Sequence, residues 1–115
     1  MSRPSKDASE EAVETLTELG LGLYAARTFV ALVALSGGTA VEVSQAAEVP
    51  RTRVYDAAEE LAEWDLIEVD ESTPQRFIPV PSDVAAERFL REYRERVRGL
   101  RTSLASLEDD RSRAR

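Results

Sequence analysis

Four side chains near the middle of the chain carry the hydrogen-bonding groups that contact nucleic-acid bases and phosphates. Arg51, Thr52 and Arg53 follow directly on Pro50, and Tyr55 lies about one helical turn beyond Arg51. An arginine guanidinium can donate two hydrogen bonds to O6 and N7 of guanine, and a threonine hydroxyl can reach a phosphate or a base. At the exposed start of a helix, this group is typical of the helix that enters the DNA major groove.

Two short helices joined by a tight turn are expected to position these side chains. Thr39 and Glu42 form a capping box, which predicts a short helix over residues 40–48. Pro50 suits the first turn of a second helix, which should run to about residue 63. The apolar residues of the second helix recur at helical spacing and should face inward. They are Val54, Ala57, Ala58 and Leu61.

The same residues also have simpler interpretations. Arg51 and Arg53 could be solvated surface arginines, although their position beside Thr52 favours DNA binding. For Tyr55, a DNA contact and a place at the edge of the core are equally good interpretations. Four acidic residues further along would wrap around the helix instead of converging, so no metal site is expected. They are Glu59, Glu60, Glu63 and Asp65.

Further helices and a β-hairpin are expected around this helix pair. Apolar spacing predicts a helix over residues 9–19 and another over residues 24–35. Alternation predicts a half-buried strand over residues 66–70, with a second strand over residues 76–80 that Pro79 should confine to an edge. This order predicts a mainly α fold with a β-hairpin wing, the winged helix-turn-helix.

A long C-terminal helix is expected over residues 82–107, capped by Ser82. Apolar residues recur along it at heptad spacing and form what we call the apolar stripe: Ala86, Leu90, Tyr93, Val97, Leu100, Leu104 and Leu107. Such a stripe is typical of a coiled coil, and a helix of about 37 Å outruns so small a domain. We therefore expect a homodimer joined through Leu90, Tyr93, Val97, Leu100, Leu104 and Leu107. The alternative is that the stripe packs on its own domain.

Composition limits the possible classes of function. The length supports one domain, expected over residues 8–81, with residues 1–7 and 108–115 as disordered tails. The chain has no cysteine and no histidine, so thiol and imidazole chemistry is excluded, and neither an enzyme nor a cofactor is expected. The longest apolar run, residues 29–35, is too short to cross a bilayer, and the first residues lack a signal peptide's apolar core. We expect no membrane partner and a cytoplasmic location.

The net charge is unusual for a protein that binds nucleic acid. The chain has 22 acidic against 15 basic residues, a net charge of −7, and Lys6 is its only lysine. We expect a halophilic host, because in molar salt the Debye length is about 3 Å and only charges in contact matter. A GC-rich genome would also explain the shortage of lysine. The alternative function is an acidic winged-helix module that dimerises or docks on another regulator without binding DNA.

The segment EVPRTRVYDAAEELAEWDLIEV resembles the TrmB-like family of archaeal transcriptional regulators, and the likeness extends from Leu19 to about Leu90. The resemblance implies a winged-helix DNA-binding domain, normally dimeric, that acts at promoters. The side chains it would place at double-stranded DNA are Arg51, Thr52, Arg53 and Tyr55. Longer relatives carry a sugar-binding effector domain after the linker helix. Because this chain stops at Arg115, no small-molecule effector is expected.

Two features depart from the family pattern. Glu48 stands in the turn where such proteins usually have glycine, and a left-handed backbone there would cost about 1 kcal/mol. The family's wing is basic, whereas this hairpin carries Glu68, Asp70 and Glu71 against Arg76 alone. Arg76 is therefore the one wing residue expected to contact phosphate, and base recognition must rest on the helix.

Overall fold

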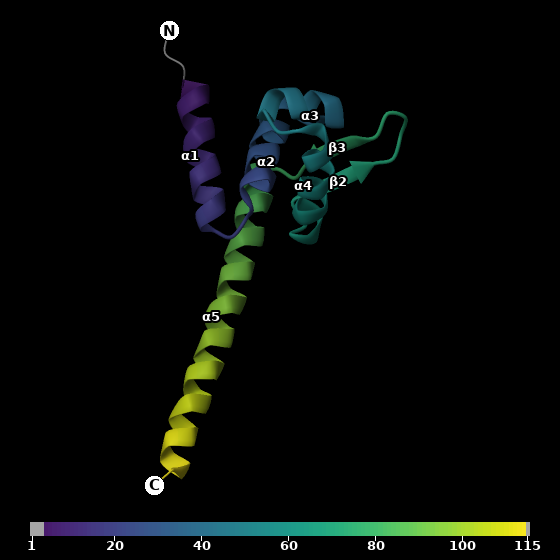
Figure 1. The fold of residues 1–115 in the computed structure, drawn as a ribbon. Coiled ribbons are helices and arrows are strands. Elements are labelled where there is room, and N and C mark those ends of the chain that lie inside the picture. Colours follow the sequence, from purple (N-terminus) through teal and green to yellow (C-terminus); the bar gives the residue numbers. More distant parts are fainter. Residues whose placement is uncertain (1–3, 115) are drawn as a thin grey trace. The chain divides into compact units, whose positions relative to one another are not determined.

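The computed structural model describes residues 4–114 and divides into two units at the Pro81–Ser82 bond (Figure 1). The elements of the first unit are α1 (Pro4–Glu18), α2 (Leu23–Leu35), β1 (Gly38–Thr39), α3 (Ala40–Ala47), α4 (Arg51–Glu63), β2 (Ile67–Asp70) and β3 (Arg76–Pro79). The second unit consists of α5 (Ser82–Arg113). None of the described helices is long and apolar enough to cross a membrane.

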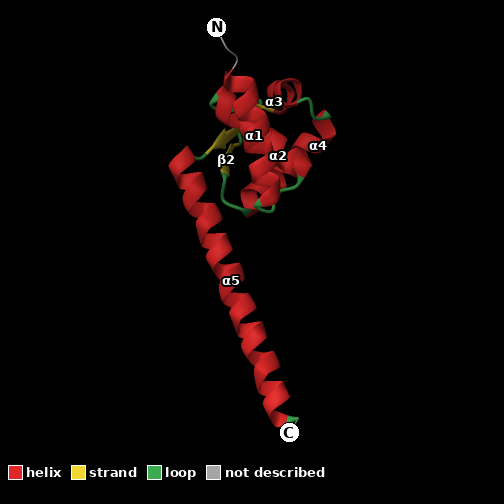
Figure 2. Ribbon diagram, turned by 90° about the vertical axis from the view of Figure 1, so that its left-hand side faces the viewer, coloured by secondary structure: helices red, strands yellow, loops and turns green. Residues whose placement is uncertain are grey.

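Helix α2 is the centre of the first unit's core. It packs against α1, α3 and α4, which surround it in Figure 2. Leu32 is fully buried, and Phe29 is nearly so. From α4, Val54 and Leu61 are also fully buried, as the helical spacing of the sequence predicted. The apolar side of α4 therefore faces the core.

A local cap sets the start of α3, and a long-range hydrogen bond sets the start of α2. The predicted capping box is present on α3: the Glu42 carboxylate accepts from the Thr39 N–H at 2.9 Å, and the Thr39 hydroxyl accepts from the Glu42 N–H at 3.3 Å. Glu60 accepts a hydrogen bond from the Gly22 N–H, at the start of α2, at 2.8 Å. This acidic residue of α4 thus has a structural role that joins α4 to α2.

The sheet has the order β1-β3-β2 and corrects two expectations. The strand β1 was not predicted, because a strand of two residues exists only through its pairing with β3. The strand β3 is central, so the edge position expected from Pro79 is wrong. Proline is tolerated there because β1 pairs only with Arg76 and Phe77, which leaves Pro79 paired on one side, with Ile67.

Both predicted tails are partly helical. Helix α1 begins at Pro4, a residue that suits the first turn of a helix, so the disordered tail is wrong for residues 4–7, and residues 1–3 lie outside the described residues. Helix α5 continues to Arg113, which contradicts the tail for residues 108–113. Arg111 and Arg113 lie in its last turn, where positive charge is favoured by the helix dipole, and Arg113 lies 3.9 Å from Asp110.

Candidate nucleic-acid interface

The turn between α3 and α4 sets the position of the α4 N-terminus. Glu48 ends α3 with φ 55° and ψ 48°, the left-handed conformation considered above, and its N–H donates to the Ser44 carbonyl. The Ser44 hydroxyl donates to the Val49 carbonyl at 2.6 Å. Val49 is buried, so its side chain and its backbone both hold the turn in place. Helix α4 then starts directly after Pro50.

A glycine at position 48 should stabilise the protein, because glycine adopts the left-handed conformation without the steric cost of a Cβ atom. We expect Glu48→Gly to raise the free energy of unfolding by about 1 kcal/mol, or the melting temperature by about 4–8 °C at a fixed protein concentration. Glu48→Gln is the matched control, since it removes the charge and keeps the Cβ atom. Equal stabilisation by both substitutions would mean that charge, not backbone strain, is responsible.

The first turn of α4 presents a row of exposed polar side chains. Arg51, Thr52 and Arg53 are all exposed, and the next residue, Val54, is fully buried. Within the described part of the chain, the Arg51 side chain has no hydrogen bond or ion pair. Its guanidinium is therefore available to an external acceptor.

Arg53 is held in position by two neighbours. Its guanidinium carbon lies 5.9 Å from the centre of the Tyr24 ring, on α2, and its Nη1 atom lies 3.8 Å from the Asp56 carboxylate. The Arg53 side chain remains 59% exposed. The sequence predicts Tyr24 only as the start of an apolar helix, and no local pattern links it to Arg53. The contact orients Arg53 without removing it from solvent.

Tyr55 occupies the edge of the core, which is one of the two places expected for it. Its ring meets the edge of the Phe77 ring at 6.4 Å and an interplanar angle of 73°, so it covers the base of the hairpin. It nevertheless remains 44% exposed. The ring joins α4 to β3 and leaves part of its surface exposed.

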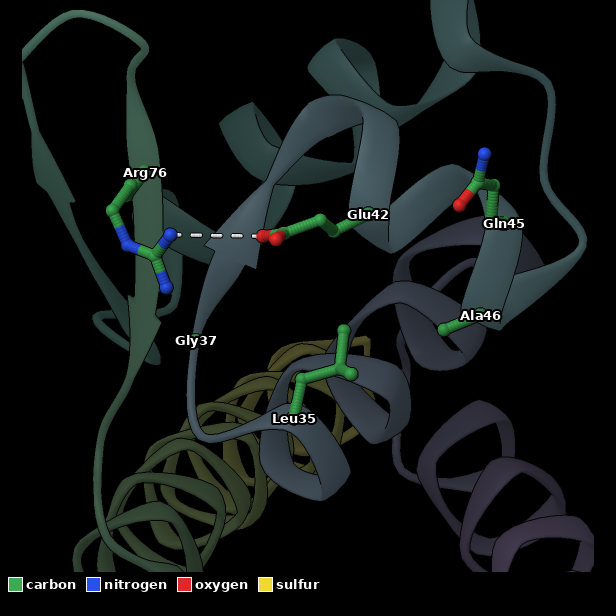
Figure 3. Close-up of a pocket in the computed structure, with 6 residues that line it drawn as sticks. All are labelled: Leu35, Gly37, Glu42, Gln45, Ala46 and Arg76. Carbon is green, nitrogen blue, oxygen red and sulfur yellow. Dashed lines mark ion pairs between the residues drawn. The ribbon is translucent and has the colours of Figure 1, made fainter.

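Arg76 does not join the α4 residues. Its guanidinium lies 3.6 Å from the Glu42 carboxylate, which also caps α3. The two side chains line an open pocket together with Leu35, Gly37, Gln45 and Ala46 (Figure 3). Neighbouring residues of a strand point to opposite faces, and Phe77 faces Tyr55. Arg76 therefore points to the other face of the hairpin, toward α3.

The hairpin itself keeps a negative charge. The Ser72 hydroxyl donates to the Asp70 carboxylate at 2.6 Å, and the Ser72 N–H donates to the same oxygen at 3.0 Å. These hydrogen bonds, with a smaller contribution from Arg76, lower the pKa of Asp70 below its ordinary value. Asp70 thus remains ionised at neutral pH, which opposes a close approach of the wing to phosphate.

The acidic residues of α4 are not gathered into one cluster. Over residues 4–114, no group of three or more Asp or Glu side chains is arranged to hold a metal ion. Glu60 is instead engaged with the start of α2. The first turn of α4 remains as a polar surface on which three adjacent side chains are exposed.

Comparison with known proteins finds relatives among archaeal transcriptional regulators. A family profile described as sugar-specific transcriptional regulator TrmB matches residues 16–83. The HTH-type sugar sensing transcriptional regulator TrmBL1 of Pyrococcus furiosus is 28% identical over 80 residues, which cover 70% of this chain and 24% of that protein. The DNA-binding HTH-type transcriptional repressor TrmBL2 of Thermococcus kodakarensis is 33% identical over 90 residues, or 77% of this chain and 34% of that protein.

A solved structure gives the same result for the fold. The structure of TrmBL2, described as an archaeal chromatin protein with a novel mode of DNA binding, matches with a TM-score of 0.79 and 29% identity. The match covers 90% of this chain and 40% of that one. The fold is therefore a winged helix, as predicted. The chain spans about a quarter to a third of the length of the curated relatives.

Proposed function

Because this chain belongs to the TrmB family of transcriptional regulators, we propose that it binds specific DNA sequences as a homodimer and regulates transcription. The main support for this proposal is the first turn of α4, where three adjacent polar side chains are exposed directly before the buried Val54. The relatives are named as regulators and not as enzymes, which agrees with the expectation for this chain.

In the proposed complex, α4 enters the major groove with its N-terminus forward. Arg51 donates to O6 and N7 of a guanine, and Thr52 contacts a phosphate. Arg53, held by Tyr24 and Asp56, reaches a second base or phosphate with little loss of side-chain freedom. The exposed part of Tyr55 packs on the same backbone. Base recognition in this proposal comes from α4 alone.

The wing has a smaller part in this proposal. Arg76 remains a predicted phosphate contact, but it must share its guanidinium with Glu42 or leave that ion pair. Asp70 and Glu71 on the same hairpin repel phosphate. We therefore assign the wing a minor share of the affinity, in contrast to the basic wing that the family resemblance implies.

The apolar stripe of α5 supports the homodimer. Its side chains from Leu90 to Leu107 are each between 46% and 64% exposed in the single chain. A monomer would leave this row of large apolar groups in water, and heptad spacing fits them to a second helix of the same kind. A dimer would present two α4 helices to two half-sites of a pseudo-palindromic operator.

The second candidate is the acidic module that docks on another regulator without DNA, and the acidic hairpin is the observation that favours it. Selection of genomic DNA fragments on the purified protein separates the two. We expect one pseudo-palindromic motif to be enriched by the wild type and by Arg98→Ala, which removes an arginine from α5, but not by the Arg51→Ala/Arg53→Ala double variant. Failure of the wild type to enrich any motif would support the second candidate.

The salt dependence of binding tests the proposed halophilic adaptation. If Arg51, Arg53 and Arg76 of both subunits neutralise phosphates, log K should fall against log salt with a slope of about −5. Salt also screens the repulsion between DNA and the acidic hairpin, and among the surplus carboxylates of the fold. We therefore expect a slope shallower than about −5 between moderate and molar KCl, with a rising melting temperature. Steep loss of binding without a gain in thermal stability would contradict the adaptation.

A further inference from the structure

The length of α5 determines which charges flank its apolar stripe. Because α5 continues to Arg113, the heptad spacing extends past Leu107 to Arg111 and Ala114. Glu108 and Asp110 then flank the stripe on the same helix as Arg94 and Arg101. From these positions we propose that two copies of α5 pair antiparallel, centred on Thr102. This inference rests on the homodimer proposed above and specifies how it is built.

The two flanks of the stripe each change sign along the helix. One flank carries Arg94, then Arg101, then Glu108, and the other carries Arg96, Ser103 and Asp110. Over residues 90–114, the positive charges come first on both flanks and the negative charges last. In an antiparallel pair each flank faces its own copy running in the opposite direction, so a basic half meets an acidic half.

In a pair centred on Thr102, basic residues of one helix lie opposite acidic residues of the other. Arg94 lies opposite the partner's Glu108, and Arg96 lies opposite the partner's Asp110, each twice by symmetry. The ion pairs within the chain, Glu92–Arg96 at 3.5 Å and Asp110–Arg113 at 3.9 Å, involve exposed side chains that can share a further partner. Arg101 meets its own copy at the axis, which is the one like-charge contact of this register.

The stripe also fits this register. Leu100 lies opposite the partner's Leu104, and Val97 lies opposite the partner's Leu107. Tyr93 lies opposite the partner's Arg111, whose guanidinium can stack on the exposed ring. The overlap runs from Leu90 to Ala114, and each exposed apolar residue in it obtains a partner.

The other arrangements bring like charges together. In a parallel pair, each stripe position faces its own copy, so Arg111 would meet a second Arg111 in the seam, and Arg96 would lie across from the partner's Arg101. An antiparallel pair centred between Arg98 and Gly99 would place Arg94 opposite the partner's Arg101, and Glu87 opposite the partner's Glu108. The register centred on Thr102 avoids all of these repulsions.

Spin labels on single introduced cysteines measure the orientation, because the natural chain has no cysteine. In the proposed pair the two copies of residue 91 are about 33 Å apart along the helix axis, whereas in a parallel pair they lie at the same level. We expect the dimer of Arg91→Cys to show a long distance and that of Thr102→Cys a short one. Short distances at both positions would overturn the antiparallel arrangement while leaving the dimer intact.

Charge reversal gives a second, independent measurement. Arg94→Glu replaces two attractive contacts by two repulsive ones, so sedimentation should show dimerisation weakened about tenfold. Adding Glu108→Arg should restore the wild-type dissociation constant. In a parallel pair residues 94 and 108 are about 21 Å apart along the helix, so no rescue would occur. Failure of rescue would overturn the register, and a monomeric wild type would refute the proposed dimer itself.

Discussion

Leu104→Asp is expected to convert the homodimer into monomers. Leu104 lies near the middle of the apolar stripe, and the substitution places one unpaired carboxylate per subunit in the contact between helices. Leaving a buried charge without a partner costs about 3–5 kcal/mol, so dimerisation should weaken by at least a few hundredfold. Sedimentation at micromolar concentration should show a single monomeric species.

A neighbouring substitution controls for the added charge. Ala105→Asp introduces the same carboxylate on α5 one residue further along, away from the stripe, and should remain dimeric. Leu104→Asp should also lose operator affinity, because each monomer contacts one half-site only. A wild type that is monomeric, or a Leu104→Asp variant that stays dimeric, would show that the stripe packs elsewhere.

Arg51→Ala and Arg53→Ala should each reduce operator binding by about 1–3 kcal/mol per half-site, the range for loss of a bidentate contact to guanine. Both side chains are exposed, so the free energy of unfolding should stay within about 0.5 kcal/mol of the wild type. The effect of Arg51→Ala should depend strongly on the base that it faces. Titration of labelled operator DNA at fixed salt measures both losses.

The control for these variants is Arg98→Ala, which removes the same charge from α5. It should bind the operator like the wild type, because Arg98 lies outside the proposed interface. Unaltered operator affinity in both α4 variants would refute DNA binding through this helix. Equal losses in all three variants would mean that net charge, and not position, determines binding.

The elements around α4 were predictable because their signals are local. Thr39 and Glu42 are three residues apart and define the start of α3, and Pro50 precedes the first residue of α4. The inward face of α4 follows from helical periodicity. The exposure of Arg51, Thr52 and Arg53 is a consequence of these two facts, so the sequence alone located the candidate interface.

The features that the sequence did not reveal depend on contacts between distant residues. Tyr24 contacts Arg53 from another helix, and Glu60 caps Gly22 across 38 residues. The direction of Arg76 follows from the packing of Phe77 against Tyr55, a contact between distant residues. A disordered tail was expected over residues 108–115, but the spacing of Asp110 and Arg113 lets them pair on a continuous helix.

Sequence preference is the most direct test of the proposed function. The affinity of the wild type for a duplex recovered by selection should be compared, at one salt concentration, with its affinity for a scrambled duplex of equal length and composition. We expect a preference of at least about a thousandfold, most of which Arg51→Ala should abolish. Equal affinity of the wild type for the two duplexes would contradict sequence-specific binding by α4.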